Sequence, residues 1–283
     1  MKIMLSILVS LTLVEMMFAM GLRLTFTGLK EVAQGNRWLL IRALFANFII
    51  IPLMTLLIIL IFHVPPMIGI GMMILGVSPA APYVLPFTIL ARGALDISIY
   101  LMIILAGISA IIVPLLLHLL LPFITPGDLL LTIDPLKMIG TLFLIQLLPL
   151  CLGLALKQWR PKLASAMLVP SARISKVLNF LMIAAIAIFQ FRILRGMSQY
   201  ELFIMILLVF IGIITGLLLG WPTRQERVSL SILTAMRNMS LGMGIAVYSF
   251  PDTPVISTVL AYSFVAGTIV LLFALIIRQA SPR

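Results

Sequence analysis

Arg237 and Asn238 stand in the middle of residues 228–249, a segment that is otherwise apolar enough to cross a bilayer. An unpaired charge at the centre of a membrane costs at least about 2.5 kcal/mol, so such residues usually face a protein interior or a water-filled cavity. A guanidinium group also binds carboxylates through two parallel hydrogen bonds. We interpret this pair as part of a solute-binding site. The alternative is a buried arginine that locks helices together through carbonyl or carboxylate groups.

Glu15 is the one carboxylate that the sequence places deep inside an apolar segment. A carboxylate at that depth needs a partner or a function, and Arg237 is the obvious candidate partner. Two alternatives are open: Glu15 is protonated, or its side chain points into an aqueous vestibule.

A pair of prolines interrupts the third apolar segment at Ser78-Pro-Ala-Ala-Pro82. Pro79 and Pro82 lack a backbone N–H and clash with preceding carbonyls, which disfavours a continuous helix. At membrane depth the freed backbone groups must be satisfied by protein or by cavity water. We predict a broken helix here, and with Ser78 it forms a second candidate part of the site. The alternative is a proline kink that serves packing alone.

Two further polar residues lie within apolar segments. Asn47 precedes Pro52 in the second segment, and an asparagine in a membrane helix is more often a hydrogen-bonding link between helices than a ligand. Ser98 follows Asp96 at the start of the fourth segment, where both side chains are suited to cap a helix.

The composition indicates an all-α, polytopic membrane protein. Of 283 residues, 63% are hydrophobic and 10% are charged, whereas a soluble domain carries about a quarter charged residues. The apolar segments have close to the roughly 20 residues that a helix needs to cross the hydrocarbon. Residues 1–20 are expected to remain as the first span rather than to be a cleaved signal peptide, because Glu15 interrupts the run and no clear cleavage site follows. We predict one transmembrane domain, residues 1–283, with nine spans near residues 3–22, 39–62, 67–91, 95–121, 136–156, 174–191, 200–220, 228–249 and 254–277.

The positions of the basic residues indicate the orientation. If the spans alternate, fourteen of the 19 Lys and Arg residues fall on one side, and the positive-inside rule places the C-terminus in the cytoplasm and the N-terminus outside. The net charge of +11 does not indicate nucleic-acid binding, because these residues are spread over short loops. The fourteen are Arg23, Lys30, Arg37, Arg42, Arg92, Lys157, Arg160, Lys162, Arg173, Lys176, Arg224, Arg227, Arg278 and Arg283, against Lys2, Lys137, Arg192 and Arg195.

The last four spans repeat the arrangement of the first four in the opposite orientation. The third span of the first set is broken by prolines, and the third span of the second set carries Arg237 and Asn238. Residues 1–121 and 174–277 are thus predicted to form inverted halves, with residues 136–156 as an unpaired helix. Such halves, with interrupted or polar helices in corresponding positions, point to a secondary transporter whose site lies where those helices cross.

Sequence motifs for catalysis and metal binding are lacking. His63 and His118 do not have the four-residue spacing of a metal-binding helix and have no Cys or carboxylate cluster beside them. Neither a Gly-rich phosphate loop nor a Gly-x-Ser-x-Gly elbow occurs. We expect neither enzyme activity nor a cofactor.

The chain resembles the bile acid:sodium symporter family. Residues 17–22, Met-Phe-Ala-Met-Gly-Leu, are similar to that family's Met-Phe-x-Met-Gly-Leu. Pro79 and Leu90-Ala-Arg-Gly93 match its first broken helix, and residues 233–238 stand in the place of its Glu-x-Gly-x-Gln-Asn motif. The resemblance implies ten helices in two inverted five-helix halves, of which the first helix is missing here. It also implies a bacterial inner-membrane location.

The resemblance further implies two sodium ions, held by oxygen ligands near the helix crossing. Asn47, Ser98 and Asn238 keep polar side chains at ligand positions. The other positions are replaced by Val84, Leu85, Met102, Leu233 and Arg237. Our hypothesis is that the Arg237 guanidinium supplies the positive charge that sodium supplies in relatives. A second hypothesis, compatible with the first, is that Arg237 binds the substrate directly.

These observations together predict a secondary transporter of an organic anion that works by alternating access, with altered or lost sodium coupling. Two alternatives are a sodium-coupled symporter with an atypical site and a non-transporting sensor or scaffold derived from the family. The expected partners are a small organic anion and the lipid bilayer. The sequence leaves the substrate, the transport direction and the oligomeric state open.

Overall fold

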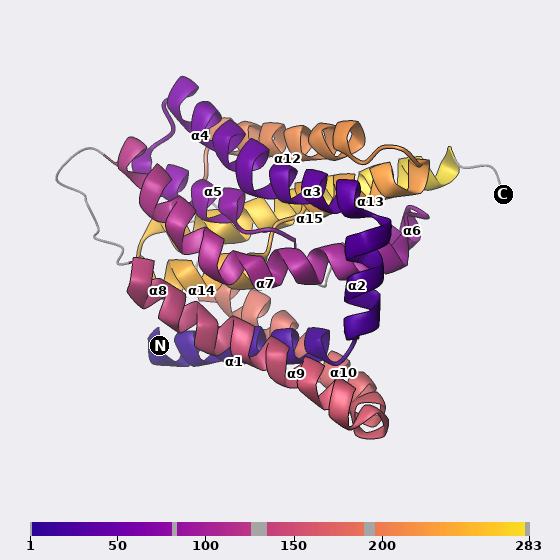
Figure 1. Cartoon of the computed structure of the whole chain (residues 1–283). Helices are drawn as coiled ribbons and strands as arrows, with labels where there is room; N and C mark the ends of the chain where they lie inside the picture. The colour runs from indigo at the N-terminus through magenta and orange to yellow at the C-terminus, as the bar shows by residue number, and fades with distance from the viewer. Residues whose placement is uncertain (1, 81–83, 126–134, 190–195, 281–283) are drawn as a thin grey trace.

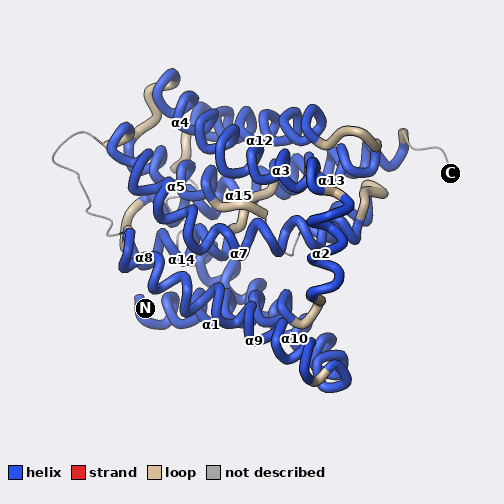
Figure 2. Tube along the Cα trace, viewed as in Figure 1, coloured by secondary structure: helices blue, strands red, loops and turns tan. Residues whose placement is uncertain are grey.

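The computed structural model of the protein describes residues 2–80, 84–125, 135–189 and 196–280. Within these residues the chain is all-helical, without strands, and the helices are joined by short loops (Figure 2). The helices are α1 (Lys2–Gly21), α2 (Phe26–Gly35), α3 (Arg37–Phe45), α4 (Ile51–Ile61), α5 (Pro66–Val77), α6 (Leu85–Leu90), α7 (Leu95–Leu120), α8 (Pro135–Leu142), α9 (Leu148–Trp159), α10 (Pro161–Phe189), α12 (Gln199–Leu219), α13 (Arg224–Ala235), α14 (Met239–Ser249) and α15 (Pro254–Gln279).

Two of the long helices contain a π-helical turn. Ala46–Ile50 joins α3 to α4, and Phe143–Leu147 joins α8 to α9. Each turn is followed by a proline, Pro52 or Pro149, whose missing N–H and bulky ring disfavour regular α-helix at the preceding turn. Each turn also carries one buried amide side chain, Asn47 or Gln146.

The predicted polytopic membrane class is confirmed. Within the described residues, seven helices are long and apolar enough to cross a membrane, and two shorter apolar helices cover Ile7–Gly21 and Pro66–Val77. Within the described residues, each of the nine predicted spans overlaps one or more helices. The count of nine is not confirmed, because these two helices are shorter than a full span.

One predicted boundary is wrong. The sixth span was expected to begin near residue 174, but α10 begins at Pro161. Proline at the first helical position and the alanine, leucine and methionine residues that follow favour helix there. The charged residues of 161–173 had excluded this part of the helix from the predicted span. The link between the first two predicted spans contains the ten-residue helix α2.

The helices form two groups, which Figure 1 shows as a lower layer and a larger upper bundle. The lower layer consists of α1, α8, α9 and α10, and within it α1 packs extensively on both α9 and α10. The upper bundle contains α3 to α7 and α12 to α15, and its most extensive contact joins α12 to α13. We refer to these groups as the lower layer and the upper bundle.

A pair of glycines sets the distance between α1 and α9. A Cβ atom added to Gly21 would lie 2.8 Å from the Cα atom of Gly153, and one added to Gly153 would lie 2.9 Å from the Cα atom of Gly21. Any larger residue at either position would therefore force the two backbones apart. Close helix packing at Gly21 is a feature that small residues permit in membrane proteins.

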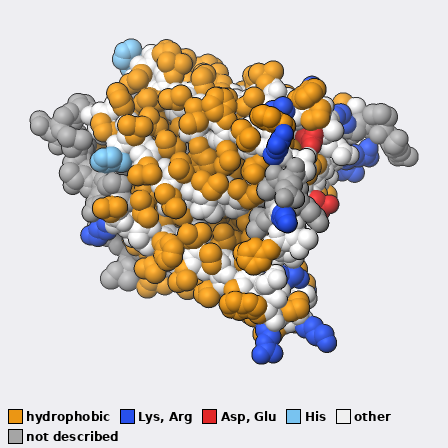
Figure 3. All heavy atoms as spheres, in the orientation of Figure 1, with side chains coloured by type: hydrophobic (Ala, Val, Ile, Leu, Met, Phe, Trp, Pro, Cys, Tyr) orange, Lys and Arg blue, Asp and Glu red, His pale blue; other side chains and the backbone are white. Residues whose placement is uncertain are grey.

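The face drawn in Figure 3 is apolar except at its ends. Hydrophobic side chains cover most of it, and most of the Lys and Arg side chains visible there gather at the end where α2, α6 and the end of α15 lie. We call this the basic end, defined by Arg23, Arg92 and Arg224. Trp38 and Trp221 are exposed, and the guanidinium carbons of Arg37 and Arg42, respectively, lie 5.5 Å from their ring centres. Tryptophan beside basic residues is typical of a membrane–water interface.

Candidate solute-binding site

The predicted break in the third span is present. Helix α5 ends at Val77, and Ser78 takes an extended conformation, with φ of −94° and ψ of 101°. The Ser78 hydroxyl donates a hydrogen bond to the carbonyl of Ile74 over 2.6 Å, which turns the side chain back onto α5. Pro79 is buried in the break. Pro82, also predicted to belong to the site, lies outside the described residues.

A second break separates α13 from α14. Met236 is extended, with φ of −86° and ψ of 133°, and ends α13. Asn238 then caps α14, because its side-chain oxygen accepts a hydrogen bond from the Leu241 N–H over 3.0 Å. An asparagine cap satisfies one of the free N–H groups at a helix start, so residues 236–238 are an ordered interruption rather than a frayed end.

The two breaks touch each other. The backbone N–H of Asn238 donates a hydrogen bond to the Ser78 carbonyl over 3.2 Å. From the neighbouring position, Nε of Arg237 donates to the Leu75 carbonyl over 2.9 Å, and Nη2 donates to the Gly76 carbonyl. The predicted crossing of the two interrupted spans is therefore confirmed, and backbone atoms of both breaks take part in it.

The Arg237 guanidinium is enclosed at this crossing, with only 3% of the residue exposed. Its Nη1 donates to Oδ1 of Asn47 over 2.7 Å and to the Thr234 carbonyl over 3.2 Å, and Nη2 also lies 3.5 Å from the Asn47 carbonyl. With the bonds to α5, these make five hydrogen bonds to described residues, and a guanidinium group has five N–H donors. Asn47 is oriented for this contact by the bond from its Nδ2 to the Ala43 carbonyl, 2.9 Å away.

The electrostatic setting of Arg237 explains why a charge is stable at this depth. The carbonyls of Leu75 and Gly76 belong to the last turn of α5, and that of Thr234 belongs to the last turn of α13. The carbonyl ends of helices carry partial negative charge, equivalent to about half an elementary charge. The guanidinium therefore neutralises two helix ends that point toward each other inside the protein.

Glu15 does not occupy the place that was expected for it. Its carboxylate accepts a hydrogen bond from the hydroxyl of Ser171 over 2.6 Å, so its partner lies on α10 within the lower layer. The hydrogen bonds of Arg237 described above go to the upper bundle. The predicted pairing of Glu15 with Arg237 is thus replaced by two separate polar contacts, one in each helix group.

Ser98 also lies apart from the hydrogen-bond network of Arg237. It is buried in the first turns of α7, and its hydroxyl donates to the Ala94 carbonyl over 2.7 Å. Asp96 lies in the first turn of the same helix, but neither Asp96 nor Ser98 caps it, because the N-cap residue is Ala94 and no side chain makes a cap hydrogen bond there. Of the predicted site residues, the structure brings together Arg237, Asn238, Asn47 and Ser78.

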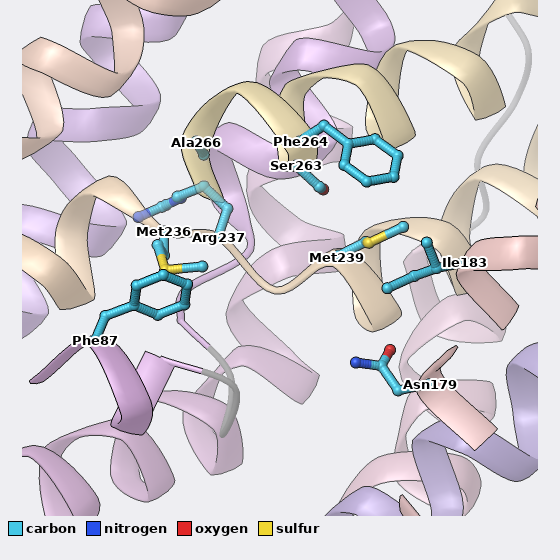
Figure 4. A pocket seen from close by; sticks show the side chains of 9 residues that line it. All are labelled: Phe87, Asn179, Ile183, Met236, Arg237, Met239, Ser263, Phe264 and Ala266. Atoms are coloured by element: carbon cyan, nitrogen blue, oxygen red, sulfur yellow. The ribbon is translucent and has the colours of Figure 1, made fainter. Parts of the chain in front are cut away.

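A cavity of about 220 Å³ lies beside the second break (Figure 4). Asn179 and Ile183 of α10 face it from one side, and Phe87 of α6 and Met236 face it from the other. In Figure 4 the guanidinium group of Arg237 points away from Asn179 and Ile183. The cavity is lined by Phe87, Asn179, Ile183, Met236, Arg237, Met239, Ser263, Phe264 and Ala266.

A larger cavity, of about 480 Å³, lies between α1, α6, α7 and α10. Its wall is mostly apolar, and two exposed cations, Arg23 and Lys176, stand among its lining residues. Asn179 lines both cavities, so they adjoin at this side chain. The larger one is lined by Met16, Ala19, Met20, Arg23, Leu85, Pro86, Ile89, Leu95, Ile99, Met102, Ala172, Ser175, Lys176 and Asn179.

The polar residues of α10 were missed by the sequence analysis. Ser171, Ser175 and Asn179 recur every four residues, a spacing that places them on one face of a helix. The regular spacing of these three residues was the available signal. Hydropathy alone did not reveal it, because two serines and one asparagine barely change the average over twenty residues.

Comparison with known proteins identifies the family. The Sodium Bile acid symporter family matches residues 10–198. This chain belongs to that family. It is also 28% identical over 253 residues to the hepatic sodium/bile acid cotransporter of Rattus norvegicus, an alignment that covers 87% of this chain and 69% of the relative.

Membership of the sodium bile acid symporter family confirms the resemblance inferred from the sequence motifs. The chain is therefore an integral membrane protein of a transporter family, not an enzyme. The matched region includes the first break and the polar stripe of α10. Arg237 lies beyond the matched residues.

Proposed function

We propose that this protein is a secondary carrier of an organic anion in which Arg237 takes the place of a sodium ion at the helix crossing. One observation carries the proposal: a buried guanidinium donates to the carbonyl ends of both α5 and α13. A permanent cation at that position stabilises two converging helix ends without a bound ion. Carriage of an organic anion is supported by the relative whose name is hepatic sodium/bile acid cotransporter.

The oxygen atoms at the crossing fit a guanidinium better than they fit sodium. The carbonyls of Leu75, Gly76 and Thr234 already accept hydrogen bonds from Arg237, as does the Asn47 side chain. Two unit charges 4 Å apart repel each other by about 4 kcal/mol at an effective dielectric constant of 20. A sodium ion beside Arg237 would find these oxygen atoms already hydrogen-bonded and would also be repelled by the guanidinium charge. This supports altered or lost sodium coupling.

The larger cavity is suited to an amphipathic anion. Arg23 and Lys176 supply positive charge, and methionine and leucine side chains supply an apolar wall. Binding sites of this size class are mostly apolar with a few polar groups that set orientation. We propose that the anionic group of the substrate lies near these two cations and that its apolar part lies deeper, toward the crossing.

Alternating access is supported by the unequal ends of the molecule. The larger cavity lies beside cations of the basic end, whereas at the other end α1 of the lower layer packs on α14 of the upper bundle. A Cβ atom added to Gly244 would lie 3.0 Å from Cδ1 of Leu13, and the hydroxyls of Ser10 and Tyr248 form a hydrogen bond. We propose that this α1–α14 contact is the closed gate of a carrier open toward its basic end.

The orientation and the internal symmetry complete the proposal. We propose that the basic end, with the C-terminus, faces the cytoplasm of a bacterial inner membrane, in accordance with the positive-inside rule. We further propose that residues 1–121 and 174–277 are inverted halves of one domain. The order of one interrupted helix in each half, α5–α6 and α13–α14, supports this symmetry.

Transport by the purified full chain in proteoliposomes tests the proposal. Labelled organic anions, with cholate as the first probe, would be offered with a sodium gradient and with a matched potassium gradient. We expect uptake above that of protein-free vesicles at equal rates in both salts. Uptake that requires the sodium gradient would contradict the role proposed for Arg237, and a sodium-coupled symporter with an atypical site would then replace it.

A second candidate function is a non-transporting sensor or scaffold. The hydrogen-bond network of Arg237 favours it, because a guanidinium bonded to three separate segments resists rearrangement of the crossing. The same vesicles separate the two functions. Binding of the anion without any uptake, in either salt, would support the sensor.

A further inference from the structure

We infer that Ser175 and Asn179 of α10 select for substrates that carry a hydroxyl group. We call these two residues the α10 polar pair. The inference rests on the proposed function, since it concerns the anion that occupies the larger cavity. It adds a chemical requirement that neither the cations nor the apolar wall imposes, namely a hydrogen-bond donor on the body of the substrate.

The position of the α10 polar pair suits contact with a bound molecule. The two residues are four apart in one helix and so lie on the same face, about 5–6 Å between their Cβ atoms. Both line the larger cavity, and Asn179 also lines the cavity beside the second break. The other helices that line this cavity contribute Met20 and Met102, which offer no strong hydrogen-bonding group.

Each member of the α10 polar pair has one buried side-chain oxygen without a hydrogen-bond partner among the described residues. Oγ of Ser175 and Oδ1 of Asn179 are buried and unpartnered within the described part of the chain. Most buried polar side-chain atoms are hydrogen-bonded, and an unsatisfied one is unfavourable. Unsatisfied atoms that line a cavity are therefore candidates for contact with a ligand.

Ser171 provides an internal comparison on the same face of α10. It lies one turn before Ser175 and is absent from the lining of either cavity. Its hydroxyl donates the 2.6 Å bond to Glu15. The stripe is thus satisfied by protein where it leaves the cavities and unsatisfied where it lines them.

The chemistry of the unsatisfied atoms defines the ligand group. An amide oxygen is an acceptor only, and a serine hydroxyl both donates and accepts. The group that satisfies Asn179 Oδ1 must therefore donate a hydrogen bond, as a hydroxyl or N–H does and a carbonyl or ether does not. Among the organic anions of the proposed function, the α10 polar pair therefore favours those that carry such a donor on the body of the molecule.

The test compares two anions that differ only in hydroxyl groups. Binding of cholate, a hydroxylated steroid carboxylate, and of cholanate, the same carboxylate without hydroxyls, would be measured calorimetrically on the purified full chain and by uptake into proteoliposomes. For the variants Asn179→Leu and Ser175→Ala, we expect the preference for cholate over cholanate to fall about tenfold, the loss of one net hydrogen bond. Cholanate binding itself should change less than twofold.

The matched control is Ser165→Ala, the same chemical change on the same helix. Ser165 is exposed, bonds to Lys157 over 3.4 Å and lines neither cavity, so its loss should leave the preference unchanged. Ser175→Ala removes a single oxygen atom and keeps the test decisive if Asn179→Leu fails to fold.

Two negative results have different meanings. If the unmodified protein binds neither anion, the proposed function fails and the selectivity with it. If it binds both anions, but Ser175→Ala and Asn179→Leu keep the full preference for cholate, only the selectivity of the α10 polar pair is overturned. Bridging water would then be the partner of these two side chains.

Discussion

Nη1 of Arg237 lies 2.7 Å from Oδ1 of Asn47, a residue 190 positions earlier in the chain. This hydrogen bond links the π-helical turn between α3 and α4 to the break between α13 and α14. Through the same guanidinium both segments are joined to the end of α5. The crossing is therefore held by one charged group that contacts three parts of the upper bundle.

Replacing Arg237 with Gln should destabilise the protein and create a response to sodium. The change removes the buried charge and leaves carbonyls of α5 and α13 unsatisfied, at a cost of about 3–5 kcal/mol. Thermal unfolding in detergent should show a lower midpoint. Sodium at 100 mM should raise that midpoint in Arg237→Gln but not in the unmodified protein.

Arg224→Gln, at the basic end, is the control for Arg237→Gln. It removes the same charge from a position that is exposed and bonds to the Ile277 carbonyl over 3.1 Å. Its midpoint should stay within a degree or two of that of the unmodified protein. An equal decrease of the unfolding midpoint in both variants would mean that Arg237 has no special role at the crossing.

Substitutions at Asn47 should separate the acceptor from the shape of the side chain. Asn47→Leu leaves Nη1 of Arg237 without this acceptor and should cost about 1–3 kcal/mol of stability. Asn47→Asp keeps an acceptor oxygen and pairs a carboxylate with the guanidinium, so it should be tolerated better. Thermal unfolding midpoints of both variants, measured in the same detergent, check this order of stability. An Asn47→Asp variant less stable than Asn47→Leu would contradict the hydrogen bond between Asn47 and Arg237.

Replacing Glu15 with Gln should leave uptake nearly unchanged. The amide retains an oxygen that accepts the hydrogen bond from Ser171. The hydrogen bonds of Arg237 described above do not involve Glu15. Glu15→Leu, which removes the acceptor, should weaken the α1–α10 contact and lower the unfolding midpoint. If Glu15→Gln abolishes uptake, the carboxylate has a direct function, such as carrying a proton.

A disulfide across the α1–α14 contact should arrest transport. In a Cys151→Ala background, cysteines replacing Leu13 and Gly244 should form a cross-link on mild oxidation, because a Cβ atom added to Gly244 lies 3.0 Å from Cδ1 of Leu13, which leaves the two Cβ atoms close to disulfide range. Uptake should stop on oxidation and return on reduction. Each single-cysteine variant is the control, and full uptake by the cross-linked protein would show that this contact does not open during transport.

Replacing Gly21 with Val should disrupt the lower layer. The added side chain meets the backbone of α9 at Gly153 and should cost at least about 1–3 kcal/mol, the usual range for overpacking. Gly267→Val is the matched control, since a Cβ atom at Gly267 of α15 meets nothing within 4 Å. Similar unfolding midpoints for the two variants would contradict the close approach of α1 and α9.

The sequence by itself determined the class of protein, the family and the two interruptions. Apolar content and segment length are local properties, and they predict membrane helices because lipid offers no partner for backbone groups. The break after Ser78 follows from proline chemistry in the same way. Arg237 was recognisable as a site residue because a charge in an apolar span requires an explanation wherever it occurs.

The tertiary structure decided which groups meet. The partners of Arg237 lie as far as 190 residues away, and the π-helical turn that presents Asn47 has no plain sequence signal. Glu15 was assigned to Arg237 on charge alone, whereas packing within the lower layer gives it Ser171. The α10 polar pair became visible only once the cavities beside it were known, because an unsatisfied oxygen is defined by what surrounds it and not by its place in the chain.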